Sequence, residues 1–313
     1  FKPFVYLTAL ERGLTPDSVR DDRPIEIKGW RPENYNREYF GPVTLARALA
    51  LSLNSVSVRL TLEVSPHAVA RTARRLGIAS RLEPNASIAL GTSEVSPLEL
   101  VSAYVPFANG GIAVAPHVVE RVVTGDGKTL YRAKSASLAR VVDERHIGMM
   151  NQMMQETLLI GTARKAEPFG WPAAGKTGTS QDFRDAWFVG YTAHLVAGVW
   201  LGNDDNSPTR KSTGGGLPVE IWSRFMKAAH QGVALAALPG MSGAPAAPAV
   251  AAFPGMSASP APAAPAVAAP VPPGSIPLGP PTSVAQNGGR APVPEPSAGL
   301  DGWLIDRLFG RRQ

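Results

Sequence analysis

After Leu238 the composition of this chain changes abruptly. Most of residues 239–299 are Ala, Pro, Gly or Ser, and Arg290 and Glu295 are the only charged residues among them. Such a segment cannot bury enough apolar surface to offset the entropy lost on ordering it. We therefore predict a folded domain at residues 1–238, followed by a disordered tail with partial polyproline II character.

The folded part alternates irregularly between helical and strand patterns. Ser96-Pro97-Leu98-Glu99 is a capping box with proline at the first helical position. The β-rich runs 185–191 and 194–202 are separated by two residues, which predicts consecutive antiparallel strands. The pattern predicts an α+β fold, with a central antiparallel sheet flanked by helices. The expected helices are 65–76, 96–109, 143–157 and 218–230, the last with Ile221, Trp222 and Phe225 on one packed face, and a hairpin is expected from 117–123 and 129–132.

The segment GWPAAGKTGTS at residues 170–180 fits two incompatible catalytic patterns. From Gly170 it matches G-x-x-x-x-G-K-[ST], the phosphate-binding P-loop, and from Lys176 it matches the K-T-G triplet of penicillin-interacting serine enzymes. A P-loop needs a buried strand before it and a helix after it. Here a polar approach containing Pro168 comes first, Pro172 removes a loop amide, and β-rich runs follow. These flanks favour K-T-G.

A K-T-G strand edge would present the groups that acyl transfer needs. Lys176 would place positive charge near the reacting centre, and Gly178 would let a substrate backbone approach closely. The hydroxyls of Thr177 and Thr179 could hold a substrate carboxylate, and the Thr179 amide could face a developing oxyanion. The simpler alternative is a turn that leads into a strand.

A second polar group, Ser52-Leu53-Asn54, lies between two apolar, helix-like runs. Ser52 could relay protons between a nucleophile and a leaving amine, and the Asn54 amide could bind a substrate peptide group. The alternative is that Ser52 ends one helix and Asn54 caps the next, because both residue types are favoured at caps.

Together with Phe1-Lys2-Pro3-Phe4, these motifs carry a family resemblance. This opening resembles the end of the S-x-x-K-P-F motif of class A, bifunctional penicillin-binding proteins, while S-L-N and K-T-G-T-S resemble their second and third motifs in the same chain order. The resemblance extends over roughly the first 230 residues. It implies the serine β-lactamase/D,D-peptidase-like transpeptidase fold and a catalytic role for Lys2, which on composition alone would be a solvated helix lysine.

The chemistry implied is peptidoglycan cross-linking through a serine acyl-enzyme. A serine three positions before Lys2 would share its helix face, and burial beside a second cation, Lys176, would favour the neutral amine that accepts a proton. The implied partners are a stem peptide ending in D-Ala-D-Ala and β-lactam antibiotics. A D,D-carboxypeptidase, a β-lactamase-like hydrolase and a non-catalytic peptide- or β-lactam-binding module stay open as alternatives.

The chain starts at Phe1, so the position of that serine precedes it. We expect the sequence to be truncated at its N-terminal side, and the fragment alone to be inactive. In class A proteins a membrane anchor and a glycosyltransferase domain precede this region, which implies a parent protein anchored in the inner membrane with this domain facing the periplasm.

The last 14 residues differ from the tail before them. Trp303, Leu304, Arg307, Leu308 and Arg311 follow helical spacing, which predicts a short amphipathic helix at 300–313. It could dock on a partner in cell-wall synthesis or contact an anionic membrane surface. The alternative is a frayed terminal peptide without a role.

Charge and composition argue against several other classes of function. The net charge is +6, but the arginines are scattered and no aromatic-basic interleaving accompanies them, so we expect no nucleic-acid partner. The chain has no cysteine and its five histidines are far apart, so neither a metal site nor another cofactor is expected. The sequence also lacks a G-x-S-x-G elbow for a Ser-His-Asp enzyme.

Overall fold

A computed structural model of the chain describes residues 1–133, 139–166 and 170–241. Residues 242–299 of the predicted 239–299 tail and the predicted helix at 300–313 lie outside these residues. In chain order the elements are α1 (Lys2–Leu10), β1 (Val19–Asp22), β2 (Gly41–Thr44), α2 (Leu45–Ala50), α3 (Asn54–Val64), α4 (Pro66–Arg75), the 3₁₀ helix η1 (Ala86–Leu90), α5 (Pro97–Ala108), β3 (Arg121–Val123), β4 (Thr129–Arg132), α6 (Glu144–Leu159), β5 (Ala174–Thr179), η2 (Gln181–Phe183), β6 (Asp185–Tyr191), β7 (Val196–Gly202) and α7 (Leu217–Ala229).

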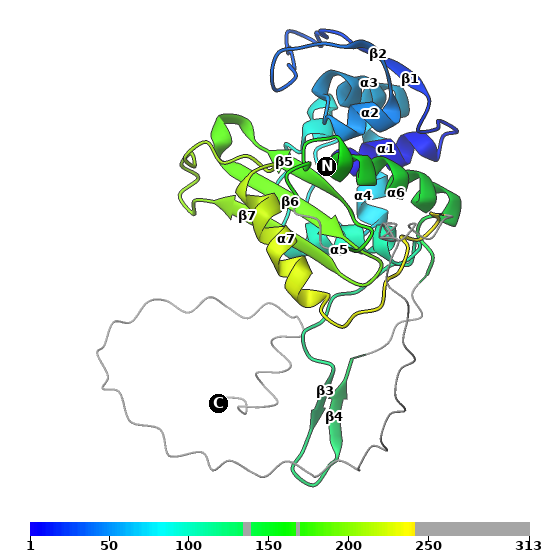
Figure 1. The fold of residues 1–313 in the computed structure, drawn as a ribbon, viewed down its shortest axis with the longest axis vertical. Helices are drawn as coiled ribbons and strands as arrows, with labels where there is room; N and C mark the ends of the chain where they lie inside the picture. The colour runs from blue at the N-terminus through cyan, green and yellow to red at the C-terminus, as the bar shows by residue number, and fades with distance from the viewer. Residues whose placement is uncertain (134–138, 167–169, 242–313) are drawn as a thin grey trace, which may run out of the picture. The chain divides into compact units, whose positions relative to one another are not determined.

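The elements predicted from pattern are confirmed, with ends that shift by a few residues. The predicted helices correspond to α4, α5, α6 and α7, and α5 begins with the predicted capping box between Ser96 and Glu99. The predicted hairpin is β3–β4, which projects from the rest of the fold in Figure 1. No helix in the described residues combines the length and apolarity needed to cross a bilayer.

The central sheet is antiparallel with strand order β5-β6-β7. Its register pairs Lys176 with Val189 and Gly178 with Trp187. Helix α7 lies over one face (Figure 1), while α5 and α6 pack on the other, where Val101 of α5 lies against Gly198. Side chains alternate between faces along a strand, so Lys176 points toward the helical half that contains α1, α2 and α3.

One face prediction is wrong. On α7 the side chain of Trp222 is buried, packs edge-on against Phe188 and donates to the Gly190 carbonyl at 3.1 Å, but Ile221 and Phe225 are 39% and 52% exposed. The reason is angular. Residues advance by about 100° around a helix, so Ile221 and Phe225 lie about 40° apart on a side that is roughly 60–100° around the helix from Trp222, at the edge of the contact with the sheet.

Helix α1 is enclosed on all sides. Every residue from Pro3 to Leu10 is buried, and Phe4 and Leu7 are fully inaccessible. An apolar helix without a polar face belongs in the interior, where each large side chain contributes about 1.5–3 kcal/mol to stability. Because Lys2 is the first residue of this core helix, its position is fixed by the core.

Packing continues slightly beyond the predicted domain end at residue 238. Leu238 is buried, the Asn151 side chain donates to the Pro239 carbonyl at 2.9 Å, and Gly240 lies directly against Gly148 of α6. A Cβ on Gly148 would come within 2.5 Å of the Gly240 oxygen, so this approach requires glycine.

Candidate active site

The amine of Lys2 lies beneath the turn that joins α2 to α3. Its Nζ is 2.8 Å from the Ser52 carbonyl oxygen, 2.9 Å from Ser52 Oγ and 2.6 Å from Asn54 Oδ1. Lys2 is therefore not the solvated helix lysine that composition alone suggests. Its amine is held by the S-x-N group instead.

Ser52 occupies a backbone position that usually belongs to glycine. Helix α2 ends in a Schellman arrangement, in which the Leu53 amide donates to the Ala48 carbonyl at 2.9 Å and the Ser52 amide donates to Leu49 at 3.0 Å. Ser52 has φ of 59°, in the left-handed region where a Cβ is strained. The serine thus does end α2, but its hydroxyl contacts two lysines and caps no helix.

Lys176 approaches the same hydroxyl from the sheet. It is only 4% exposed, and its Nζ lies 2.9 Å from Ser52 Oγ and 3.1 Å from the Thr177 carbonyl oxygen. Figure 1 shows the start of α1 close to β5, in agreement with these contacts. The first, second and third motifs therefore meet at one oxygen atom.

The environment favours the neutral form of both amines. Burial is the main cause that lowers the pKa of Lys2 well below its ordinary range, and the charge of Lys176 adds to it. Burial alone lowers the pKa of Lys176 to about 7. Protonating both amines would place two positive charges close together in a buried site, which is costly. Near neutral pH one of the two amines is therefore available as a base.

Asn54 is held from both ends of its amide. Its Oδ1 accepts from Lys2, while its Nδ2 donates to the Glu33 carbonyl at 2.7 Å. Its backbone amide donates to Asn34 Oδ1 at 2.8 Å. Asn54 is the first residue of α3, whose N-cap is Leu53, so its side chain does not act as the cap that propensity suggests.

The remaining residues of the third motif line the open end of the site. Thr177 Oγ1 lies 2.5 Å from the Thr162 hydroxyl, and the Thr179 hydroxyl accepts from the Gly214 amide at 3.0 Å. Thr177 Oγ1 also lies 3.5 Å from Lys176 Nζ, so this hydroxyl is close to the lysine site. Gly178 is half-buried and Thr179 is exposed, so the site opens to solvent at this end of β5.

The P-loop interpretation does not fit this backbone. Gly175, Lys176 and Thr177 lie within strand β5, which is followed by η2 and strand β6 and not by an α-helix. The segment therefore lacks the helix N-terminus whose amides would bind phosphate.

Sequence reasoning missed the residues that hold these groups in place. Asn34 and Glu33 orient Asn54, Thr162 contacts Thr177, and Gly214 contacts Thr179. None of them belongs to a motif that carries chemistry. The signals available were the polar Pro-Glu-Asn run at 32–34 and the Gly-rich run at 214–216, which indicate turns and not a site.

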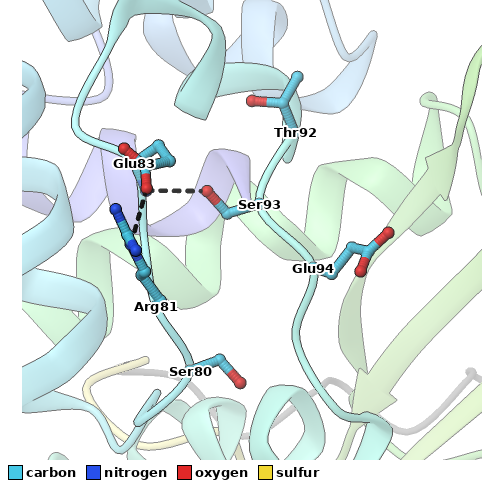
Figure 2. Close-up of a pocket in the computed structure, with 6 residues that line it drawn as sticks. All are labelled: Ser80, Arg81, Glu83, Thr92, Ser93 and Glu94. Atoms are coloured by element: carbon cyan, nitrogen blue, oxygen red, sulfur yellow. Dashed lines mark hydrogen bonds and ion pairs between the residues drawn. The ribbon is translucent and has the colours of Figure 1, made fainter.

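Elsewhere, a polar hollow lies between two exposed loops, lined by Ser80, Arg81, Glu83, Thr92, Ser93 and Glu94. Figure 2 shows Glu83 bridging to Arg81 and Ser93. None of these six residues is buried, in contrast to the lysine site. Within the described residues, no three His, Asp or Glu side chains gather in a way that would hold a metal ion.

Comparison with known proteins gives the same assignment as the geometry. The family described as "Penicillin binding protein transpeptidase domain" matches residues 1–227. Penicillin-binding protein 1A of Neisseria meningitidis serogroup B is 38% identical over 248 residues, covering 74% of this chain and 31% of that protein. The chain thus spans about a third of the length of this relative.

Solved structures extend the match to three dimensions. PonA1, a penicillin-binding protein from Mycobacterium tuberculosis, is 31% identical with a TM-score of 0.71, covering 76% of this chain and 69% of that one. PonA1 in complex with penicillin V is 30% identical with a TM-score of 0.68, covering 76% and 70%. The class of fold predicted from the three motifs is confirmed, and the chain belongs to the penicillin-binding protein transpeptidase domain family.

Proposed function

We propose that this chain is the D,D-transpeptidase domain of a bifunctional cell-wall synthase, which cross-links peptidoglycan stem peptides through a serine acyl-enzyme. The observation that carries the proposal is the meeting of Lys2 and Lys176 at Ser52 Oγ, 2.9 Å from each Nζ, in a setting that lowers both pKa values. Such a pair of buried amines offers a base and a nearby cation for one reaction centre.

The first step is acylation. A serine three positions before Lys2 attacks the carbonyl carbon of the penultimate D-alanine, and its proton passes to the neutral Lys2 amine. Lys176 and the Thr179 amide stabilise the negative charge that develops on the carbonyl oxygen. The peptide C–N bond then breaks, and the terminal D-alanine leaves with a proton returned from Lys2 through the Ser52 hydroxyl.

The second step transfers the acyl group. An amine from a neighbouring stem peptide attacks the ester carbonyl and loses its proton to Lys2 through Ser52. The ester C–O bond then breaks, and the serine oxygen takes a proton back from Lys2, which restores the neutral amine. Asn54 would bind a substrate peptide group, and the hydroxyls of Thr177 and Thr179 would hold the terminal carboxylate. The Gly214 amide occupies one lone pair of the Thr179 hydroxyl, which leaves its proton free to donate.

β-Lactams would be trapped at the first step, since the ring-opened acyl-enzyme resembles the natural intermediate. The PonA1 complex with penicillin V supports this extension to the present chain. We also propose that the protein containing this domain is anchored in the inner membrane and that the domain faces the periplasm.

The test is covalent labelling by a fluorescent penicillin. A chain extended upstream through the S-x-x-K motif should be labelled, and the 313-residue chain should not. Lys176→Ala in the extended chain should slow acylation by about 100-fold while circular dichroism still reports a folded domain. An extended chain that stays unlabelled contradicts the proposal, and labelling of the shorter chain would place the nucleophile elsewhere.

The products distinguish the function from its alternatives. A transpeptidase given a stem peptide ending in D-Ala-D-Ala and an acceptor amine releases D-alanine and forms a cross-linked product. Release of D-alanine with the hydrolysed peptide alone indicates a carboxypeptidase, and rapid release of opened penicillin indicates a β-lactamase. Binding without release of either product indicates a binding module.

A further inference from the structure

A fully buried carboxylate lies one layer behind Asn54. Asp22, at the end of β1, is inaccessible to solvent. Its Oδ1 accepts from Asn34 Nδ2 at 2.8 Å and from the Ser55 hydroxyl, and its Oδ2 accepts from the Phe40 amide at 3.0 Å. A buried carboxyl group requires hydrogen-bond partners of this kind, and here they fix the 23–40 loop against the first turn of α3.

Asn34 uses the other end of its amide to cap α3 from a distance. Its Oδ1 accepts from the backbone amides of Asn54 at 2.8 Å and Ser55 at 3.3 Å. The first amides of a helix have no partner within it, and the N-cap residue Leu53 has no side-chain acceptor to offer. Asn34, 20 residues before Asn54, supplies the acceptor that the local sequence lacks.

The neighbour of Asn34 then sets the direction of the Asn54 side chain. Asn54 Nδ2 donates to the Glu33 carbonyl at 2.7 Å, so Asn54 Oδ1 faces Lys2 Nζ, 2.6 Å away. A flipped amide would turn its oxygen toward the Glu33 carbonyl oxygen, which is a repulsive contact between two acceptors. The loop that carries Glu33 and Asn34 therefore selects one orientation.

We propose that Asn34, held by Asp22, is a positioning residue of the acyl-transfer site: it fixes the first turn of α3 so that Asn54 presents its carbonyl oxygen to Lys2. The inference rests on the proposed function for its catalytic meaning. Its structural part, the cap on α3, is measurable without any catalysis.

Hydrogen exchange on the 313-residue chain tests the cap directly. The amides of Asn54 and Ser55 should be protected, although first-turn amides normally exchange freely. Asn34→Ala should speed their exchange at least about 10-fold relative to Thr61, an interior residue of the same helix, because the acceptor is lost. Exchange that is fast already in the unchanged chain, or that Asn34→Ala leaves the same, overturns the proposal.

Asn151→Ala is the matched control, because it removes another buried asparagine side chain, which makes three hydrogen bonds. Asn151 donates to Phe107 and Pro239 and accepts from the Tyr191 hydroxyl, away from α3. It should lower global stability but leave the Asn54-to-Thr61 exchange ratio unchanged. If both alanine variants change the ratio equally, the effect is general loosening and the specific role of Asn34 is rejected.

A reciprocal exchange separates the contact between Asp22 and Asn34 from mere burial. Asn34→Asp alone places two carboxylates together and should release the cap. Adding Asp22→Asn restores one donor and one acceptor between the two side chains, and the new carboxylate at position 34 can still accept from Asn54 and Ser55. The Glu38 carbonyl, which accepts from Asn34 Nδ2 at 2.9 Å in the unchanged chain, stays without that donor, so protection should return in part. Failure of the double variant to recover any protection would contradict a direct contact.

Acylation of the chain extended through S-x-x-K reports the catalytic consequence. Asn34→Ala should lower the acylation rate constant by about 10- to 100-fold with a smaller change in penicillin affinity, since small displacements of catalytic groups cost rate. The double exchange should recover part of that loss, and Asn151→Ala should show none. If the unchanged extended chain is not acylated, the proposed function fails, while the exchange data still decide the cap.

Discussion

Lys176 donates to the hydroxyl of Ser52 at 2.9 Å, a contact between residues 124 positions apart in the chain. Ser52 Oγ is equally far from Lys2, so one hydroxyl connects the core helix α1 to the sheet. A hydroxyl with two lone pairs and one proton can accept from one amine and exchange a proton with the other. This arrangement gives Ser52 the position of a relay between two buried bases.

Replacement of Ser52 should separate stability from activity. Its left-handed backbone is strained with a Cβ, so Ser52→Gly should be more stable than Ser52→Ala by about 1 kcal/mol in chemical denaturation. Both variants lose the relay, and acylation of the extended chain by fluorescent penicillin should fall by about 100-fold or more. Ser57→Ala, which removes a buried hydroxyl of α3 that donates to the Leu53 carbonyl, should leave acylation unchanged. Equal stability of the two Ser52 variants would argue against backbone strain.

The buried lysines should make stability depend on pH at the alkaline side. Burial lowers the pKa of Lys176 from 10.5 to about 7, so between these values the unfolded chain binds more protons than the folded one. The free energy of unfolding therefore rises as the pH increases from about 7 to 10.5, by at most about 1.4 kcal/mol for each pH unit. Below pH 7 the buried amine destabilises the folded state to its full extent. Lys176→Met should flatten the rise in denaturation experiments from pH 6.5 to 10.

Lys227→Met is the control for this measurement, because Lys227 lies on the exposed side of α7. It should leave the pH dependence unchanged. A slope that is the same in Lys176→Met and in the unchanged chain would mean that Lys176 is charged in the folded state at neutral pH.

The sequence was sufficient to find the side chains that meet in the candidate site but not the residues that hold them in place. Lys2, Ser52 and Lys176 stand in motifs whose order and flanks predict a shared site, and the structure brings them to one oxygen. Asn34 acts through hydrogen bonds to backbone amides of a distant helix, a role that depends on the path of the 23–40 loop. No local pattern encodes that path, so polar supports of this kind become visible only in three dimensions.

In the fold, too, features set by local signals were predictable and features set by distant contacts were not. Periodicity and caps predicted α4, α5, α6, α7 and the strands β6 and β7, because those signals act over a few residues. The packed side of α7 was misjudged, since Ile221 and Phe225 are as apolar as Trp222 and only the position of the sheet distinguishes them. The left-handed backbone at Ser52 was equally hidden, because glycine is the usual residue at that step of a Schellman turn.

Glycine at position 214 should be essential for the third motif. A Cβ there would come within 2.3 Å of the Trp187 carbonyl oxygen and 2.4 Å of the Gly178 oxygen, on rigid backbone of β6 and β5. Gly214→Ala should therefore cost about 1–3 kcal/mol of stability and slow acylation of the extended chain, since it displaces Gly178 and the amide that binds Thr179. Gly216→Ala is the matched control, with its closest contact at 3.4 Å. Equal effects of the two substitutions would show that the loop can shift away from β5.

Glu99 should stabilise the domain in an acid-sensitive way. Hydrogen bonds from the Ser80 side chain, then from the Ser96 amide, lower its pKa from 4.5 to about 2. Because the folded-state pKa is depressed, its contribution is complete above about 4.5 and is lost as the pH falls toward 2. Glu99→Gln removes the carboxylate that closes the capping box and also accepts from the Ala79 amide at 2.9 Å, so its melting temperature at pH 6 should be lower than that of the unchanged chain. The difference in melting temperature between the two proteins should shrink as the pH is lowered from 5 to 2, which thermal melts in matched buffers would measure.

Glu94→Gln, at an exposed carboxylate a few residues away, is the control and should leave the melting temperature unchanged at each pH. If the difference in melting temperature between Glu99→Gln and the unchanged chain stays constant from pH 5 to 2, ionised Glu99 stabilises the domain no more than a neutral side chain with the same hydrogen bonds.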